Sequence, residues 1–417
     1  MVTERPVITY QETPVGLAKN CFPDSGPVLI NQKGISGDYL PIRERLVQSN
    51  LSREQEAALD LLVNKDGYWI YSFDRLDIYG MPLDELTLNL TRLLSPIYLL
   101  VNSSLSTIGR DFNRHGLEEH VLPVGRRGRL LIRDSFDESR ERNFIIAALA
   151  HDIGNLCNRT GHQLTAARIL ERVLPEITDS PADWEEIKKA IIFHDEAEAE
   201  AGVAQFIHQA ITEQQDPHSF LNLIRKEWGE VSLALFLADK TDVGTRRVGL
   251  KAGKQEGIVD IDSHAVANLL METNSVDCFD SEMRWVLDFT PQPTNEQEAE
   301  QLSAYVRPRS SGTGNRWSVP KEMRDLYRNN GISHFDTAKN RFIRLYFDRI
   351  RMAILCGLAL TDGGKFELTL RDLIDAGGAG SYFTIKTTPE TVLEWFKKDG
   401  FWPKKYIDKK ERRNWPY

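Results

Sequence analysis

The feature that most constrains this chain is an apolar helical run, residues 145–150, that leads directly into the adjacent pair His151 and Asp152. Two polar side chains at the end of an apolar helix are costly to bury unless a partner compensates them. A metal ion is the usual compensation, because imidazole nitrogen and carboxylate oxygen both bind divalent cations. The alternative is that the pair caps the helix end, where short polar side chains satisfy free backbone groups.

Three more polar residues lie downstream on segments that periodicity predicts to be helical: His162, His194 and Asp239. Each has apolar residues at several of the positions three, four, seven and eight away, which is the spacing of a helix face turned toward a core. Each also has an ordinary alternative, either a hydrogen-bonded core histidine or, for Asp239, an ion pair with an arginine. One shared metal site accounts for all of these inward polar residues together.

In this combination the residues resemble the HD-domain superfamily of metal-dependent phosphohydrolases, most strongly over about residues 115–250. Residues 147–155, Ala-Ala-Leu-Ala-His-Asp-Ile-Gly-Asn, are similar to the signature helix end of that superfamily. Residues 237–243, Leu-Ala-Asp-Lys-Thr-Asp-Val, followed by Arg246 and Arg247, are similar to the closing motif of a subgroup of uncharacterised bacterial and archaeal members. The resemblance implies an HD-like helical bundle built around a metal site.

The resemblance also implies six ligands for one or two divalent ions, drawn from Mn, Mg, Fe, Co, Ni and Zn. These ligands are His120, His151, Asp152, His162, His194 and Asp239. Asp152 would bridge the ions, with His162 and His194 completing the second site. His115 rivals His120 as the upstream ligand, because Pro123 makes the local helix irregular. A bridging carboxylate holds two cations close together, and a hydroxide between them is a nucleophile at neutral pH.

Position 155 departs from the superfamily, because many members carry Lys where this chain has Asn155. Asparagine donates hydrogen bonds but brings no charge. The sequence therefore does not identify the residue that protonates the leaving group. The catalytic candidates are Asp152 and three nearby cations, Arg159, Lys240 and Arg246. Guanidinium groups suit phosphate oxygens through their two-pronged geometry.

Both arginines that follow Asp239 also have a simpler interpretation. Arg246 and Arg247 are then solvated or pair with Asp242, since many surface ion pairs carry no function. If the helix containing Asp239 continues, Asp242 and Arg246 share its face.

Composition limits the function classes. The chain has 417 residues and a net charge of −9, which argues against a general nucleic-acid binder. Four scattered cysteines without a Cys-x-x-Cys spacing suit reduced thiols, and the chain lacks an apolar run long enough to cross a membrane or to act as a signal peptide. We therefore expect a cytoplasmic protein without a membrane partner.

One segment is basic, in contrast to the net negative charge of the whole chain. Residues 397–417 carry eight Lys/Arg and three acids, with aromatic residues between them. Such a tail can bind single-stranded nucleic acid, or it can pack its aromatics on the body of the protein and leave its lysines in water.

The chain is expected to be mainly α, with an additional small α/β region toward the C-terminus. Three parts are predicted: a mixed extension over 1–85, a helical metal-binding domain over 86–275, and an α+β region over 276–417 that ends in the basic aromatic tail. Alternating apolar residues predict strands over 283–289 and 365–370, and the spacing of Phe342, Tyr346, Ile350 and Ile354 predicts a long helix between them. This last region would pack on the helical domain, line its cleft or build a homo-oligomer.

The function expected from these features is metal-dependent hydrolysis of a phosphate ester or anhydride in a nucleotide or related small phosphorylated molecule. An HD-type di-iron oxygenase is the first alternative, because the same ligands suit iron. A binding or regulatory module with a structural metal is the second.

Overall fold

In the computed structural model, the described residues are 51–63, 81–107, 115–132, 136–157, 161–173, 181–195, 216–244, 271–279, 281–289, 346–362, 364–371 and 382–398, with 28–29, 68–69 and the single positions Leu46, Arg247, Asn268 and Phe342. The chain divides into two compact units. The first comprises residues 1–108, 115–125 and 135–199, and the second comprises 109–114, 126–134 and 200–417. The sequence-based boundaries after residues 85 and 275 stay predictions.

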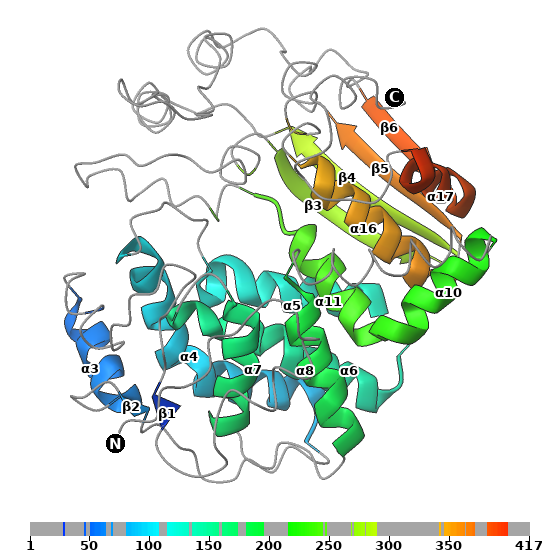
Figure 1. Cartoon of the computed structure of the whole chain (residues 1–417). Coiled ribbons are helices and arrows are strands. Elements are labelled where there is room, and N and C mark those ends of the chain that lie inside the picture. Colours follow the sequence, from blue (N-terminus) through cyan, green and yellow to red (C-terminus); the bar gives the residue numbers. More distant parts are fainter. Residues whose placement is uncertain are drawn as a thin grey trace, which may run out of the picture. The chain divides into compact units, whose positions relative to one another are not determined.

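Among its described residues, the first unit is helical apart from one short pair of strands (Figure 1). Its elements are β1 (Val28–Leu29), α3 (Arg53–Leu62), β2 (Tyr68–Trp69), α4 (Leu83–Thr107), the π-helical turn η1 (Leu117–Val121), α6 (Glu138–Ala150), the 3-10 turn η2 (Ile153–Leu156), α7 (His162–Val173) and α8 (Pro181–Phe193). Strands β1 and β2 pair antiparallel. Helix α5 (Leu122–Ile132) begins in this unit and ends in the other.

Local sequence explains where two of these helices begin. Ser52 forms the capping box expected of Ser-x-x-Gln: its hydroxyl accepts from the Gln55 N–H at 3.2 Å, and the Gln55 side chain accepts from the Ser52 N–H at 2.8 Å. Asp137 caps α6 by accepting from the Arg140 N–H at 2.9 Å. Residues 143–150 of α6 are all buried, and α6 packs against α4, α7 and α8. The end of α6 therefore lies inside the first unit.

The second unit combines helices with a four-stranded sheet. Its elements are α10 (Pro217–Trp228), α11 (Glu230–Lys240), β3 (Met271–Phe279), β4 (Glu282–Phe289), α16 (Phe347–Leu360), β5 (Lys365–Arg371), β6 (Tyr382–Thr387) and α17 (Pro389–Lys398). Asp216 caps α10, whose first residue is Pro217, and Gly229 with φ 81° separates α10 from α11.

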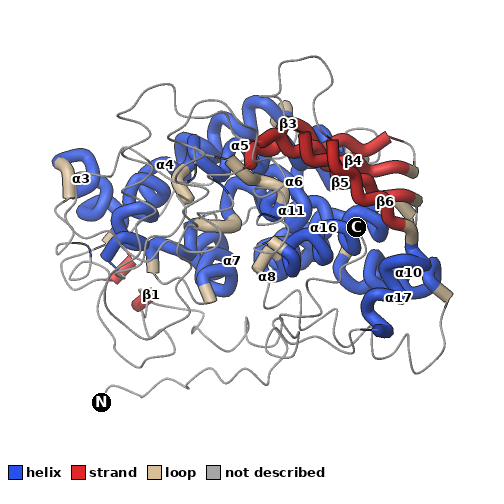
Figure 2. Tube along the Cα trace, turned by 90° about the horizontal axis from the view of Figure 1, so that it is seen from above, coloured by secondary structure: helices blue, strands red, loops and turns tan. Residues whose placement is uncertain are grey.

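The strand order is β3-β4-β5-β6. Strands β4 and β5 are parallel, with Trp285 opposite Leu368, and the two outer pairs are antiparallel. A parallel pair needs a crossover connection, and α16 lies in it. Figures 1 and 2 both show α16 on one face of the sheet. The buried side chains of β4 and β5 alternate along each strand: Met283, Trp285, Leu287, Phe366, Leu368 and Leu370.

These elements confirm the expected fold class, which is mainly α with a small α/β region. The strands predicted over 283–289 and 365–370 are β4 and β5, and the helix predicted between them is α16, which begins at Phe347. Among the described helices, none has a stretch of the length and apolarity that crossing a bilayer requires.

Candidate metal centre

The His-Asp pair lies at the C-terminal end of α6, inside the first unit. His151 is fully buried and Asp152 is 2% exposed. His151 caps α6, and Asp152 precedes η2. Both polar side chains therefore point into the protein, where a charged group without a partner is costly.

Two histidines of the site are oriented by the same kind of backbone contact. His151 Nδ1 lies 2.7 Å from the carbonyl oxygen of Ala148, and His194, which directly follows α8, makes the equivalent contact with the carbonyl of Ile191. Carbonyls in the last turn of a helix have no helical partner of their own. Because a carbonyl only accepts, each Nδ1 carries a proton, and in the neutral ring the Nε2 atom is left with a lone pair.

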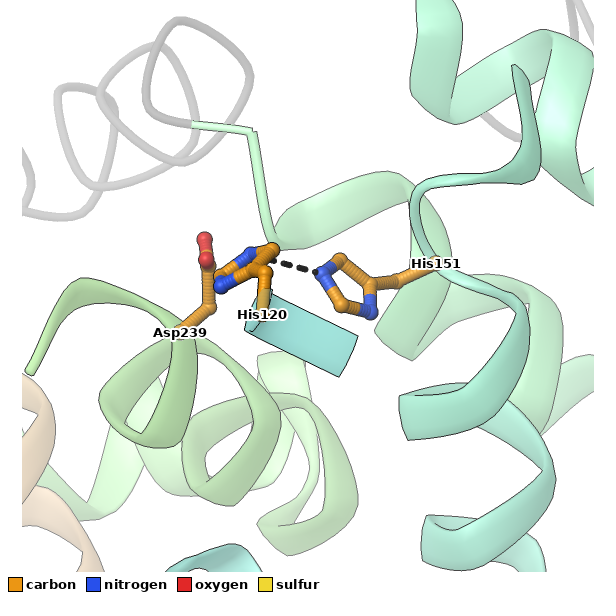
Figure 3. A group of neighbouring side chains, drawn as sticks. All are labelled: His120, His151 and Asp239. Carbon is orange, nitrogen blue, oxygen red and sulfur yellow. Dashed lines mark hydrogen bonds between the residues drawn. The ribbon is translucent and has the colours of Figure 1, made fainter. Parts of the chain in front are cut away.

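The Asp152 carboxylate presents its two oxygens to different histidines. Oδ2 lies 3.3 Å from His120 Nε2 and 3.4 Å from His151 Nε2. Oδ1 lies 3.4 Å from His162 Nε2 and 3.7 Å from His194 Nε2. Within each pair the nitrogens are also close: 3.4 Å for His120 and His151, which Figure 3 joins by a dashed line, and 3.0 Å for His162 and His194. Each oxygen thus forms a triangle of donor atoms with two ring nitrogens.

In the neutral tautomers this arrangement brings lone pairs together, and a cation between them would relieve the repulsion. The Nε2 lone pairs of His151 and His194 face carboxylate oxygens, and Asp152 Oδ2 is buried without a hydrogen-bond donor among the described residues. Ligand atoms that share an ion at about 2.0–2.2 Å lie roughly 3 to 4 Å apart, which matches the separations observed here. The ligand atoms of His151, Asp152 and His194 all lie within 4.8 Å of one another. The cluster can therefore hold a metal ion.

The electrostatics of the cluster also favour a cation. Burial acts to raise the pKa of Asp152, but the neighbouring imidazoles of His151, His115 and His120 hold that pKa well below its usual range. Burial lowers the pKa of His194 to about 4, so this ring is neutral at pH 7 and available as a ligand. Helices α6 and α8 both end at the cluster, and helix C-termini carry partial negative charge.

Asn155 fixes the orientation of the carboxylate. Its Nδ2 donates to Asp152 Oδ1 at 2.8 Å, and the residue is fully buried. Hydrogen bonds of this kind hold ligating carboxylates in the geometry that an ion needs. Asn155 thus holds one oxygen of the Asp152 carboxylate in place.

The place of His162 depends on a close backbone contact at Gly154. A Cβ atom at position 154 would lie 1.8 Å from the His162 carbonyl oxygen and 2.6 Å from the Ala166 nitrogen. His162 is the first residue of α7, and Gly161 before it has φ 75°. Only glycine at position 154 allows η2 and the start of α7 to approach this closely.

Both upstream histidines lie at the same carboxylate oxygen. His120 Nε2 is 3.3 Å from Asp152 Oδ2, and His115 Nε2 is 3.9 Å from it. The irregularity expected near Pro123 takes the form of the π-helical turn η1, which directly precedes α5. Single π-turns inside helices occur frequently at functional sites.

Tyr98 is a neighbour of the site that no sequence pattern singled out. It lies on α4, and its hydroxyl donates to the carbonyl oxygen of Leu149 at 2.8 Å, near the end of α6. Burial, and after it the charge of Asp152, raise the pKa of Tyr98 well above 10. An apolar helix face with one tyrosine is typical of any core, so only the tertiary contact identifies it.

The remaining ligand candidate, Asp239, belongs to the second unit. It is 6% exposed at the end of α11, and Lys240 Nζ donates to its Oδ2 at 2.6 Å. Lys240 also lies over the ring of Phe236, 5.3 Å from its centroid. A neighbouring lysine is therefore one partner of Asp239, and the role of Asp239 as a metal ligand stays a prediction.

The segment after Asp239 has a different structure from a continued helix. Helix α11 ends at Lys240. Asp242 therefore lies beyond the helix and does not share a helix face with Asp239. Asp242 is buried between two arginines: Arg127 Nη1 lies 2.8 Å from its Oδ1, and Arg247 Nε lies 3.8 Å from its Oδ2. The pairing of Arg247 with Asp242 is thus observed, and Arg127 is a second partner that sequence spacing did not identify.

Three sequence-based candidates fall outside the described residues. These are Arg159, Arg246 and the basic tail beyond Lys398. The roles assigned to them stay predictions.

Comparison with known proteins gives no match: no family model fits the chain, and no curated protein or solved structure is significantly similar to it. We therefore infer function from the geometry of the site.

Proposed function

We propose that the protein is a metal-dependent phosphohydrolase that cleaves a phosphate ester or anhydride in a nucleotide or related small phosphorylated molecule. The observation that carries this proposal is the Asp152 carboxylate, whose two oxygens each face a separate pair of imidazoles. A carboxylate in this setting is suited to bridge two divalent ions. Paired ions supply Lewis acidity and a nucleophile from water at neutral pH.

The residues of the first unit would prepare that centre. Backbone carbonyls fix the Nδ1 protons of His151 and His194, so both rings offer Nε2. Asn155 holds Oδ1 of the bridging carboxylate. A preorganised centre avoids the cost of rearranging ligands during the reaction.

The resemblance to HD-domain phosphohydrolases adds the parts of the proposal that lie beyond this cluster. It suggests Asp239 as a further ligand, and Arg159, Lys240 and Arg246 as contacts for the substrate phosphate. Because position 155 is Asn, these cations would supply the charge that a lysine provides in related sequences.

A panel of nucleotides and other small phosphorylated molecules tests the reaction. The protein, loaded in turn with Mn²⁺, Co²⁺ or Mg²⁺ under anaerobic conditions, should release phosphate or a nucleoside monophosphate from some members of the panel. His194→Ala should abolish the release, whereas His218→Ala, at an exposed position on α10, should leave it unchanged. Activity that is the same in the His194 variant would contradict the proposal.

The histidine-rich cluster also favours one alternative, an HD-type di-iron oxygenase, because imidazole suits iron as well as other transition metals. Oxygen consumption that depends on both substrate and reduced iron, without anaerobic phosphate release, would support the oxygenase. Tight metal binding with neither reaction would support a binding or regulatory module.

A further inference from the structure

His115 lies at the cluster but is not needed by the ligand set that the sequence suggests. Its side chain is 5% exposed, and its Nε2 is 3.9 Å from Asp152 Oδ2. The ring packs edge-on against His120, with centroids 5.4 Å apart. His115 is thus the first of a row of edge-packed imidazoles that continues through His120, His151, His194 and His162.

The backbone explains how two histidines five positions apart reach the same oxygen. In an α-helix, residues five apart point about 140° away from each other. Here the π-helical turn η1 closes with a bond from the Val121 N–H to the Gly116 carbonyl at 3.3 Å. Just before this turn, the His115 N–H donates to Asn102 Oδ1 on α4 at 3.0 Å. His115 itself lies outside the helix, because Gly116 is extended (φ −72°, ψ 167°), so helical spacing does not separate the two rings, and the Asn102 anchor holds His115 at the same oxygen as His120.

We propose that His115 is a further ligand of the metal ion bound at the Oδ2 side of Asp152. Nitrogen and oxygen ligands at about 2.0–2.1 Å from one ion lie about 2.9 Å apart when adjacent and about 4.2 Å apart when opposite. The Nε2–Oδ2 distances of His120, His151 and His115 are 3.3, 3.4 and 3.9 Å, and all fall within this range. The proposal rests on the metal centre proposed above and does not depend on the reaction that this centre performs.

The extra imidazole has a consequence for metal choice. With His115, the metal site at Asp152 Oδ2 contains three imidazole nitrogens and one carboxylate oxygen, all from the first unit. Imidazole suits Zn, Cu, Fe and Ni, whereas Mg²⁺ prefers oxygen ligands. The ion bound here should therefore be a transition metal that excess Mg²⁺ does not displace.

The wild-type protein provides the first test. In the Co²⁺-loaded, ¹⁵N-histidine-labelled protein, each ring bound through Nε2 retains an Nδ1–H whose proton NMR signal is displaced by the paramagnetic ion. We expect such a signal for His115, assigned by its loss in His115→Gln. A His115 ring whose signals stay at ordinary diamagnetic positions would overturn the proposal, even if the protein binds two ions.

Metal affinity provides the second test. Removing a residue that only supports a ligand costs about 10- to 100-fold in metal affinity, and loss of a ligand should cost at least as much. His115→Gln should therefore weaken Co²⁺ or Zn²⁺ binding for one equivalent by about tenfold or more, and His218→Gln should not. Thermal unfolding of the metal-free variants checks that both are folded. Unchanged affinity in a folded His115→Gln protein would overturn the proposal, whereas failure to hydrolyse any phosphate would leave it standing.

Discussion

Asn155 donates its side-chain amide to Asp152 Oδ1 at 2.8 Å, on the oxygen that faces His162 and His194. This contact gives Asn155 a structural role, because it fixes the orientation of the Asp152 carboxylate. Because an amide is neutral, Asn155 orients the carboxylate without adding the positive charge that a lysine at this position would bring to the cluster.

Removing this amide should weaken metal binding at the Oδ1 side. Asn155→Ala leaves the carboxylate free to rotate, and loss of such a supporting hydrogen bond costs about 10- to 100-fold in metal affinity. Calorimetric titration of the metal-free protein with Co²⁺ or Zn²⁺ measures the change for each equivalent. Equal affinities in the variant and the wild type would show that Asn155 does not orient Asp152.

Gly154→Ala should destabilise the protein and displace His162. The added methyl group meets backbone atoms at 1.8 and 2.6 Å, which cannot move without shifting α7. Forced overpacking of this kind typically costs about 1–3 kcal/mol of unfolding free energy. Urea unfolding of the metal-free protein measures the loss.

Gly125→Ala is the matched control for this substitution. Gly125 lies in α5, and a Cβ there would have no atom within 4 Å among the described residues. Alanine is the better helix former by about 1 kcal/mol, so this variant should be as stable as the wild type or more so. If both variants lost stability equally, the close contact between Gly154 and α7 would not be the cause.

Acid should destabilise the metal-free protein partly through His194. The pKa of its ring is about 4 in the folded protein, against 6.5 for an unperturbed histidine, because burial disfavours the charged form. The folded protein then binds fewer protons than the unfolded chain between these values. The contribution of the neutral ring is complete above about pH 6.5 and is lost as the pH falls toward 4.

Urea unfolding at several pH values between 7 and 4 measures this effect. In His194→Gln the free energy of unfolding should decline less steeply across that window, because the glutamine does not titrate. An identical slope in the two proteins would mean that other groups cause the acid sensitivity.

The sequence predicted the fold class and brought together much of the candidate site. Helical periodicity placed His162 and His194 on inward faces, and the apolar run before His151 predicted a buried helix end. These signals are local, because the spacing of apolar residues along a helix shows which of its faces is buried. For the same reason the alternating residues of β4 and β5 were recognisable as strands.

What the sequence could not provide is the set of contacts between elements. The bond from Asn155 to Asp152, the close approach at Gly154 and the bond from Tyr98 to Leu149 all depend on how separate segments pack. The extended Gly116 and the π-helical turn that together lie between His115 and His120 have no reliable sequence pattern. Pro123 indicated an irregular helix but not its form.

Metal stoichiometry of Asp152→Asn tests the central claim, that the two oxygens of Asp152 serve two ions, most directly. Elemental analysis after equilibrium dialysis against Co²⁺ or Mn²⁺ should find about two equivalents in the wild type, as expected of a bridged pair of ions. His194→Ala should keep about one equivalent. Asp152→Asn should lose nearly all metal, whereas Asp137→Asn, at a capping position where Asn serves as well as Asp, should bind like the wild type. Metal content in Asp152→Asn equal to that of the wild type, or a wild-type protein that binds no divalent metal, would contradict the account.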